Sequence, residues 1–128
     1  MPSWQAYKEE AKARGALALE LYVVKSVPAG PPDALRAVLP DHLAYQRQLE
    51  EKGLLAFAGP VSDPSGELME GAGLIVYRTG SMAEARALAD ADPMHSSGAR
   101  QYSLCRWLIN EGSLNLSVGF STNRATMT

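Results

Sequence analysis

The order of strand-like and helix-like segments constrains the fold of this chain more than any other feature of its sequence. Short apolar runs bounded by glycine, proline and other turn residues occupy residues 19–25, 54–61, 73–78 and 100–109. Runs of this length and composition are typical of strands. Helical patterns fall between the first and second run and between the third and fourth. The resulting order, β-α-β-β-α-β, predicts an α+β protein with the split βαβ, ferredoxin-like arrangement.

Four residues set the expected ends of the two helices. Pro40 suits the first turn of a helix, so the first helix is predicted over residues 40–52. Ser81 and Glu84 form the S-x-x-E pattern of a capping box, so the second helix is predicted to begin at this point. Pro93 disfavours the helical conformation in the residue before it, which predicts that the second helix ends there.

Further segments are predicted outside this pattern. Residues 2–14 form an expected short helix that ends at Gly15. Residues 113–121 alternate apolar and polar side chains, which predicts a half-buried strand that extends the sheet or reaches across to a partner subunit. We expect residues 1–128 to form a single domain around a core of residues 19–109.

The first and last strands of the pattern carry apolar side chains on both faces. In the first strand, Leu21 and Val23 alternate with Tyr22 and Val24. Helices that cover one face of a four-stranded sheet leave the other face bare, and a bare apolar face requires a partner. The pattern therefore predicts a homodimer, or a higher homo-oligomer, with sheets packed face to face.

The charge and hydropathy of the chain predict neither a nucleic-acid nor a membrane partner. Twelve basic and fourteen acidic residues give a net charge of −2, which offers no electrostatic argument for binding to nucleic acid or to a membrane surface. No apolar run approaches the length of a membrane span, and no apolar stretch follows the N-terminus, so we expect a cytoplasmic protein.

The single cysteine, Cys105, excludes an internal disulfide and lies in a strand-like run that predicts a buried side chain.

His42 and Asp92 are the residues best suited to proton chemistry. His42 follows Pro40 by two residues, so it is expected in the first helical turn, where the helix dipole keeps the imidazole neutral and able to accept a proton. Asp92 continues the apolar face of the second helix from Leu88, and a carboxylate on that face needs a partner such as a protonatable ring. We expect the two to form one site. The alternative is that His42 is a hydrogen-bonded core residue and Asp92 a surface residue at a helix end.

Three residues are expected to bound a pocket beside this pair. Gln46 shares the apolar face of its helix with His42, because the two are four residues apart. Gly59 and Pro60 are predicted to turn the chain at the end of the second strand and to bring its backbone near the pocket.

Met94 and His95 are further candidates for contacts with a substrate, in a stretch predicted as a loop. His95 is expected to be either a second acid–base group or a surface histidine. The spacing of the histidines and carboxylates matches no metal-ligand pattern, so no metal is expected. No phosphate loop or dinucleotide fingerprint occurs, so no cofactor is expected either.

The order of three short motifs resembles the YCII-related family. These motifs are His42-Leu43-Ala44-Tyr45, then Ala58-Gly59-Pro60, then Ala91-Asp92-Pro93. The resemblance covers residues 19–109 and implies the fold of dimeric α+β barrels such as muconolactone isomerase. It also implies a pocket with a His–Asp pair at His42 and Asp92. Met94 stands where the family usually has an aromatic residue, and the segments outside residues 19–109 lie outside the family pattern.

One branch of the family, by this resemblance, eliminates chloride from a chlorinated hydroquinone. The sequence therefore predicts a cofactor-free enzyme that acts on a small cyclic or aromatic metabolite by proton transfer, as a lyase or isomerase. His42 is the expected general base, and Asp92 is expected to orient it. The alternative is a small-ligand-binding or interaction module without catalysis, in which both residues are polar anchors.

Overall fold

A computed structural model describes residues 1–128, which divide into two compact units. Residues 20–107 form one unit, which we call the core unit. Residues 1–19 and 108–128 form the other, which we call the terminal unit. No helix in either unit is long and apolar enough to cross a membrane.

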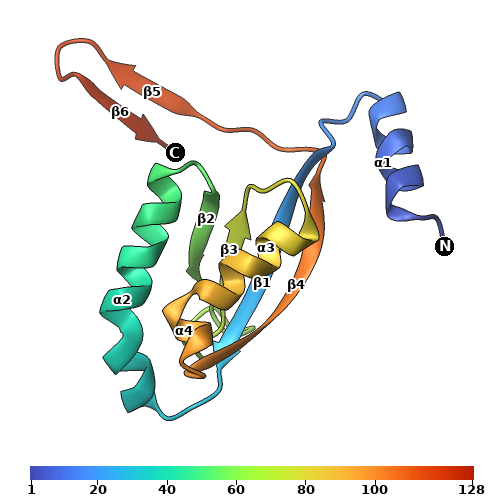
Figure 1. The fold of residues 1–128 in the computed structure, drawn as a ribbon. Helices are drawn as coiled ribbons and strands as arrows, with labels where there is room; N and C mark the ends of the chain where they lie inside the picture. The colour runs from blue at the N-terminus through green and yellow to red at the C-terminus, as the bar shows by residue number, and fades with distance from the viewer. The chain divides into compact units, whose positions relative to one another are not determined.

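The core unit is built on a four-stranded sheet with helices on one face (Figure 1). Its elements in chain order are β1 (Leu19–Pro28), α2 (Pro32–Glu51), β2 (Leu55–Pro60), β3 (Gly73–Tyr77), α3 (Met82–Ala91), α4 (Pro93–Ser96) and β4 (Arg100–Ile109). The strands lie in the order β2-β3-β1-β4, and β3 pairs antiparallel with both of its neighbours. This order confirms the predicted ferredoxin-like α+β fold.

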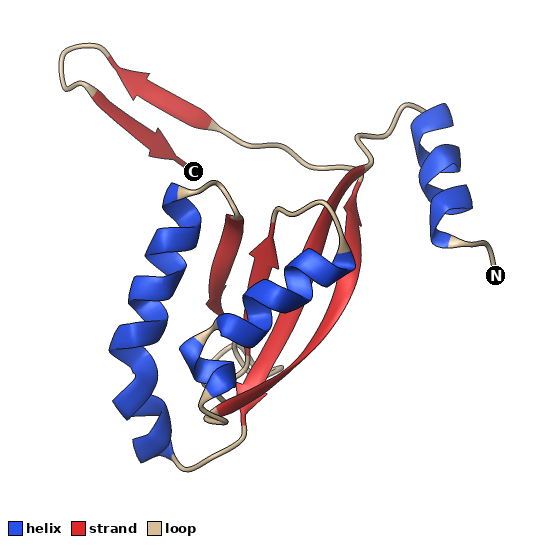
Figure 2. Ribbon diagram, in the orientation of Figure 1, coloured by secondary structure: helices blue, strands red, loops and turns tan.

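The core lies between the sheet and the two longer helices (Figure 2). Tyr22 pairs with Tyr77 and Val24 with Ile75 across β1 and β3, so all four side chains point to the same face. They pack against buried residues from both helices, among them Leu49, Ala85 and Ala89. Ala85 and Ala89 of α3 are fully buried. Their small side chains let this helix approach the sheet closely.

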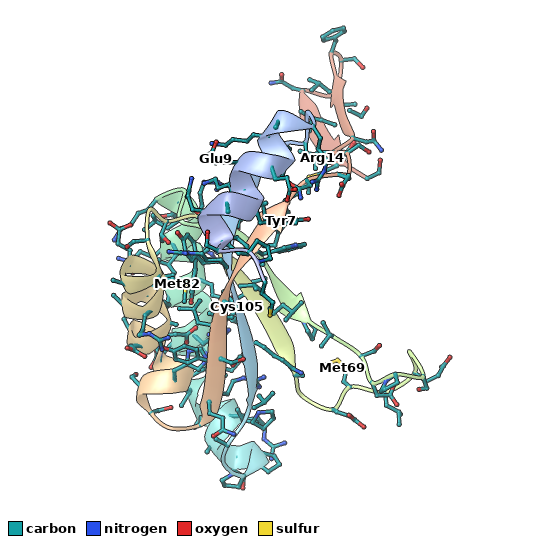
Figure 3. All side chains as sticks on the ribbon, turned by 90° about the vertical axis from the view of Figure 1, so that its right-hand side faces the viewer. Tyr7, Glu9, Arg14, Met69, Met82 and Cys105 are labelled. Atoms are coloured by element: carbon teal, nitrogen blue, oxygen red, sulfur yellow. The ribbon has the colours of Figure 1, made fainter.

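The other face of the sheet has no helix of the core unit upon it and carries exposed apolar side chains. Phe57, Leu74 and Trp107 are 53%, 37% and 45% exposed. Cys105 is also exposed, so the prediction that it is buried is wrong. Side chains alternate along a strand, and Leu104 packs against the core, which turns Cys105 to the open face. Figure 3 shows Met82 of α3 on one side of β4 and Cys105 on the other.

Helix α2 begins earlier than its sequence predicts. It runs from Pro32, and Pro40 lies inside it, so the prediction of a helix that starts at Pro40 is wrong. A proline within a helix lacks the N–H group that would reach the carbonyl four residues earlier. Pro40 and Arg36 are both exposed, so water is available to the carbonyl that loses its partner.

The limits of α3 agree with the sequence pattern. The Ser81 side chain accepts a hydrogen bond from the Glu84 N–H at 3.1 Å, and Glu84 accepts one from the Gly80 N–H at 2.8 Å. Asp92 ends the helix in extended backbone, with φ −63° and ψ 124°. The next four residues form the short helix α4, although a loop was expected, because Asp92 caps it by accepting the Met94 N–H at 2.9 Å.

The terminal unit contains one helix and a two-stranded sheet. Helix α1 (Trp4–Ala13) is capped by Ser3 and confirms the predicted N-terminal helix. Strands β5 (Leu116–Gly119) and β6 (Arg124–Met127) pair only with each other. The predicted single strand is thus the first arm of a hairpin and does not extend the main sheet. Asn123 has a positive φ of 58°, which asparagine tolerates better than most residues, and this lets the chain turn back.

Candidate functional site

The structure brings His42 of α2 against Asp92 at the junction of α3 and α4. His42 Nδ1 lies 2.8 Å from Asp92 Oδ1 and 2.9 Å from Oδ2. The Asp92 side chain is 0% exposed and the His42 side chain 15% exposed. A carboxylate only accepts hydrogen bonds, so Nδ1 carries the proton and donates it. In the neutral ring, Nε2 is then the nitrogen that accepts a proton.

The positions of both residues are fixed by neighbouring hydrogen bonds. Asp92 Oδ1 also accepts the Met94 N–H, which holds the carboxylate at the start of α4. Tyr45, one turn after His42 on α2, donates its hydroxyl to the Leu88 carbonyl of α3 at 2.7 Å. Burial, and then the charge of Asp92, raises the pKa of the Tyr45 hydroxyl, so it remains a donor. The two helices are therefore tied together beside the pair.

His42 does not lie at the helix end that its sequence context suggested. Because α2 begins at Pro32, His42 is ten residues inside the helix, and the predicted effect of the N-terminal dipole does not apply. The hydrogen bond to Asp92 decides instead which ring nitrogen carries the proton. This hydrogen bond requires that α2 pass over the end of α3, and it does not require that His42 lie at the end of its own helix.

A cavity of about 400 Å³ opens beside His42. The residues that line it come from α2, β2, the loop before β3, β3 itself, α4, the last part of β1 and the first residue of β4. They are Ser26, Leu39, His42, Leu43, Gln46, Ala58, Gly59, Pro60, Met69, Gly71, Ala72, Gly73, Leu74, Ile75, Met94 and Arg100. Of the residues predicted for the site, His42, Gln46, Gly59, Pro60 and Met94 thus surround one space. Figure 3 labels Met69 in the loop between β2 and β3.

The apolar face of α2 carries Leu39, Leu43 and Leu49, and the first two do not pack on the sheet. Leu49, near the end of the helix, is 3% exposed and packs in the core. Leu39 and Leu43 are 42% and 53% exposed and line the cavity instead. Only the last part of this apolar face therefore packs on the sheet.

A second hollow, of about 610 Å³, lies between α2 and β2. It shares Leu43, Gln46 and Ala58 with the cavity beside His42. Neither His42 nor Asp92 lines it. We therefore place the candidate site at the smaller cavity, which His42 lines while the buried Asp92 holds its ring.

Arg100, which sequence reasoning missed, is the permanent charge of this cavity. Its Nε donates to Ser26 Oγ at 2.8 Å, and its Nη2 donates to the Ser26 carbonyl at 2.8 Å and to the Gly71 carbonyl. Burial lowers the pKa of the Arg100 guanidinium, and the charge of Asp92 opposes that change. One sequence feature could have identified Arg100 as a site residue. It is a basic residue at the start of an apolar strand, and it lies on the same face of that strand as Tyr102 and Leu104.

His95 does not line the cavity and is not a free surface residue. Its Nδ1–H donates a hydrogen bond to the Ala89 carbonyl at 2.7 Å. Its Nε2 is therefore an acceptor, and it accepts a hydrogen bond from the Ser26 hydroxyl at 2.9 Å. Its ring lies 4.7 Å from that of Tyr102, centroid to centroid. His95 therefore reaches the cavity through Ser26 and Arg100. No group of three or more His, Cys, Asp or Glu side chains is placed to hold a metal ion.

Comparison with known proteins bears on the core unit and its flanks. The family model of the YCII-related domain matches residues 17–108. No curated protein sequence matches the chain. Among solved structures, the chain is similar to 5-chloro-2-hydroxyhydroquinone dehydrochlorinase from Burkholderia phenoliruptrix in complex with 2,5-dihydroxybenzoquinone, at 19% identity and a TM-score of 0.49. That match covers 68% of this chain and 92% of the other.

Proposed function

The chain belongs to the YCII-related family, and from this premise and the site geometry we propose that it is an enzyme of small cyclic or aromatic metabolites. The proposed reaction is a proton transfer, as in a lyase or an isomerase. One observation carries the proposal. The His42 Nδ1–H is held by a buried carboxylate, while the same ring lines a cavity of small-molecule size.

In the proposed mechanism, His42 Nε2 takes a proton from a carbon atom of the substrate. Asp92 keeps the proton of the neutral ring on Nδ1 and stabilises the imidazolium that forms. In an isomerisation, the proton returns to a different atom of the substrate. In an elimination, the electron pair of the broken C–H bond forms a double bond, and the leaving group departs with its own bonding pair. Neither route transfers electrons out of the substrate, so neither requires a redox cofactor.

The remaining predicted residues supply the walls of the site in this proposal. Gln46 lines the cavity, and in this proposal its amide hydrogen-bonds a polar group of the substrate. Gly59 and Pro60 bound the cavity with backbone, and Met94 contributes an apolar surface. Met94 is 5% exposed, so its side chain is packed in place.

A non-catalytic small-ligand-binding module is the second candidate, because the cavity exists whether or not turnover occurs. In that case His42 and Asp92 anchor a polar group of the ligand. Crystals soaked with a panel of small aromatic and keto acids would identify the class of ligand. Weaker binding by His42→Ala, together with no turnover of the bound compound by the unaltered protein, would favour this candidate.

We further propose that the protein is a homodimer with sheets packed face to face. The exposed apolar side chains of the open face, Phe57, Leu74 and Trp107, support this arrangement. Sedimentation equilibrium at micromolar concentration is expected to give twice the mass of the 13.7 kDa chain or a higher multiple. A monomer at that concentration would contradict the proposal.

The hairpin of β5 and β6 is expected to stabilise the assembly. Its register places Leu116 opposite Met127 and Val118 opposite Ala125, so one face is apolar, and Leu116 and Val118 are 64% and 57% exposed. A two-stranded hairpin is marginally stable by itself. Truncation after Gly112 should therefore lower the melting temperature and weaken the assembly in sedimentation. An unchanged melting temperature and mass would show that the hairpin has no such role.

A further inference from the structure

The cavity constrains the charge of what it binds. We propose that its ligand is a small organic acid, ionised at neutral pH, and that Arg100 binds the carboxylate. This inference deepens the proposed function and rests on the same cavity. It does not require that the bound acid undergo a reaction.

The distribution of charge around the cavity is the first argument. Arg100 and His42 are the only ionisable residues in the lining, and neither aspartate nor glutamate is among them. Asp92 is bonded to His42, and Arg100 takes part in none of the ion pairs of the chain. The lining therefore holds one permanent positive charge and no carboxylate. The charge of Asp92 reaches Arg100 from outside the lining, where Asp92 is hydrogen-bonded to His42.

The hydrogen bonds of Arg100 are the second argument. A guanidinium group has five N–H donors. Ser26 and the Gly71 carbonyl accept three of them, one from Nε and two from Nη2. The two N–H groups on Nη1 have no acceptor within the chain. These charged donors suit a carboxylate, which accepts strong hydrogen bonds from guanidinium.

The supports behind Arg100 are the third argument. Ser26 is 3% exposed, and its hydroxyl accepts from Arg100 while it donates to His95. His95 is fixed in turn by the Ala89 carbonyl. This chain of bonds holds the guanidinium in one orientation, unlike that of a mobile surface arginine. We infer that His95 and Ser26 are positioning residues for Arg100.

The cavity also limits the size of the acid. Its volume of about 400 Å³ is near the lower end of the range of ligand sites, about 300–1,000 Å³. Most of the lining is apolar, including Leu39, Leu43 and Ile75. A single ring or a short chain that carries a carboxylate matches this combination of volume, apolar wall and one cation.

Benzoate and benzamide test the inference, because they have nearly the same shape and differ in charge. Dissociation constants for both are measured by NMR titration of the full chain. We expect benzoate to bind more tightly than benzamide by about tenfold to a hundredfold, the usual effect of a charge-assisted hydrogen bond. Arg100→Gln should abolish this preference. Ser26→Ala should reduce this preference, because the guanidinium loses the hydroxyl that accepts its Nε–H.

Arg106→Gln is the matched control. Arg106 lies on the same strand and the same face as Arg100, pairs with Glu20 at 3.6 Å and does not line the cavity. This control makes the same change in net charge and should keep the preference for benzoate. Should Arg100→Gln fail to fold, Arg100→Lys retains the charge without the planar fork, and its preference for benzoate should be smaller than that of the unaltered protein and of Arg106→Gln.

Equal affinity for the two probes would overturn the inference. So would the absence of benzoate binding up to its solubility limit, or a preference that survives in Arg100→Gln. The outcome is separable from that of the proposed enzyme activity, because the affinities for benzoate and benzamide are measured without turnover. Anion binding with no turnover of any compound would contradict the proposed enzyme activity and support the anion site. Turnover of neutral substrates, without a preference for benzoate over benzamide, would support the enzyme activity and contradict the anion site.

Discussion

Replacing His42 with alanine is expected to lower kcat by about 10²- to 10⁴-fold, which is the usual contribution of a positioned general base. The ring lies at the cavity with Nδ1 bound to Asp92, so its removal eliminates the only nitrogen placed to accept a proton. Steady-state kinetics of the unaltered protein and the variant would be compared on a substrate found by screening small aromatic and keto acids, with chlorinated hydroquinones included.

Leu43→Ala provides the control for this substitution. Leu43 is the next residue of α2, lines the same cavity and has no ionisable group. Its removal should raise KM more than it lowers kcat, because it supplies only an apolar wall. A His42→Ala protein that turns over the substrate at the unaltered rate would refute the proposed mechanism.

Replacing Asp92 with alanine is expected to destabilise the core unit strongly. It should lower the free energy of unfolding by about 2–4 kcal/mol, since loss of a helix cap costs about 1 kcal/mol and a buried donor left unpaired about 1–3 kcal/mol. Asp92 caps α4 through the Met94 N–H and accepts the Nδ1–H of His42. Equilibrium unfolding in urea measures the change.

Asp92→Asn separates the charge of this residue from its hydrogen bonds. Oδ1 accepts both the Met94 N–H and the His42 Nδ1–H, so an amide oxygen at that position can keep both. The amide NH2 group replaces Oδ2, which lies 2.9 Å from Nδ1, so the contact of His42 with that oxygen is lost. The asparagine variant should therefore be more stable than the alanine variant, and its kcat should fall less than that of His42→Ala. Equal stability of the unaltered protein and Asp92→Ala would show that the carboxylate does not hold the two elements together.

The positions of the strands and of α3 follow from short-range rules that the sequence carries by itself. The hydroxyl of Ser81 and the carboxylate of Glu84 act within one turn of the helix they begin. Pro93 acts on the residue directly before it and ends the helix at Asp92. The steric and hydrogen-bonding requirements of such residues are met within a few positions, whatever the rest of the chain does.

Pro40 shows where these local rules leave two outcomes open. A proline is compatible with the first turn of a helix, and it also occurs inside a helix when water reaches the carbonyl it leaves unpaired. The structure has the second outcome, because α2 continues through an exposed position. The local sequence does not distinguish between them.

The order of the elements, and hence the fold, can be predicted from the amino-acid sequence, and so can two residues whose types and positions require partners. Which groups meet across long separations depends on the tertiary structure. His42 and Asp92 are 50 residues apart, and Ser26 and Arg100 are 74 apart. Whether such side chains meet depends on how helices pack on a sheet. That packing brought Arg100 into the cavity, placed His95 behind it and turned Cys105 to the open face.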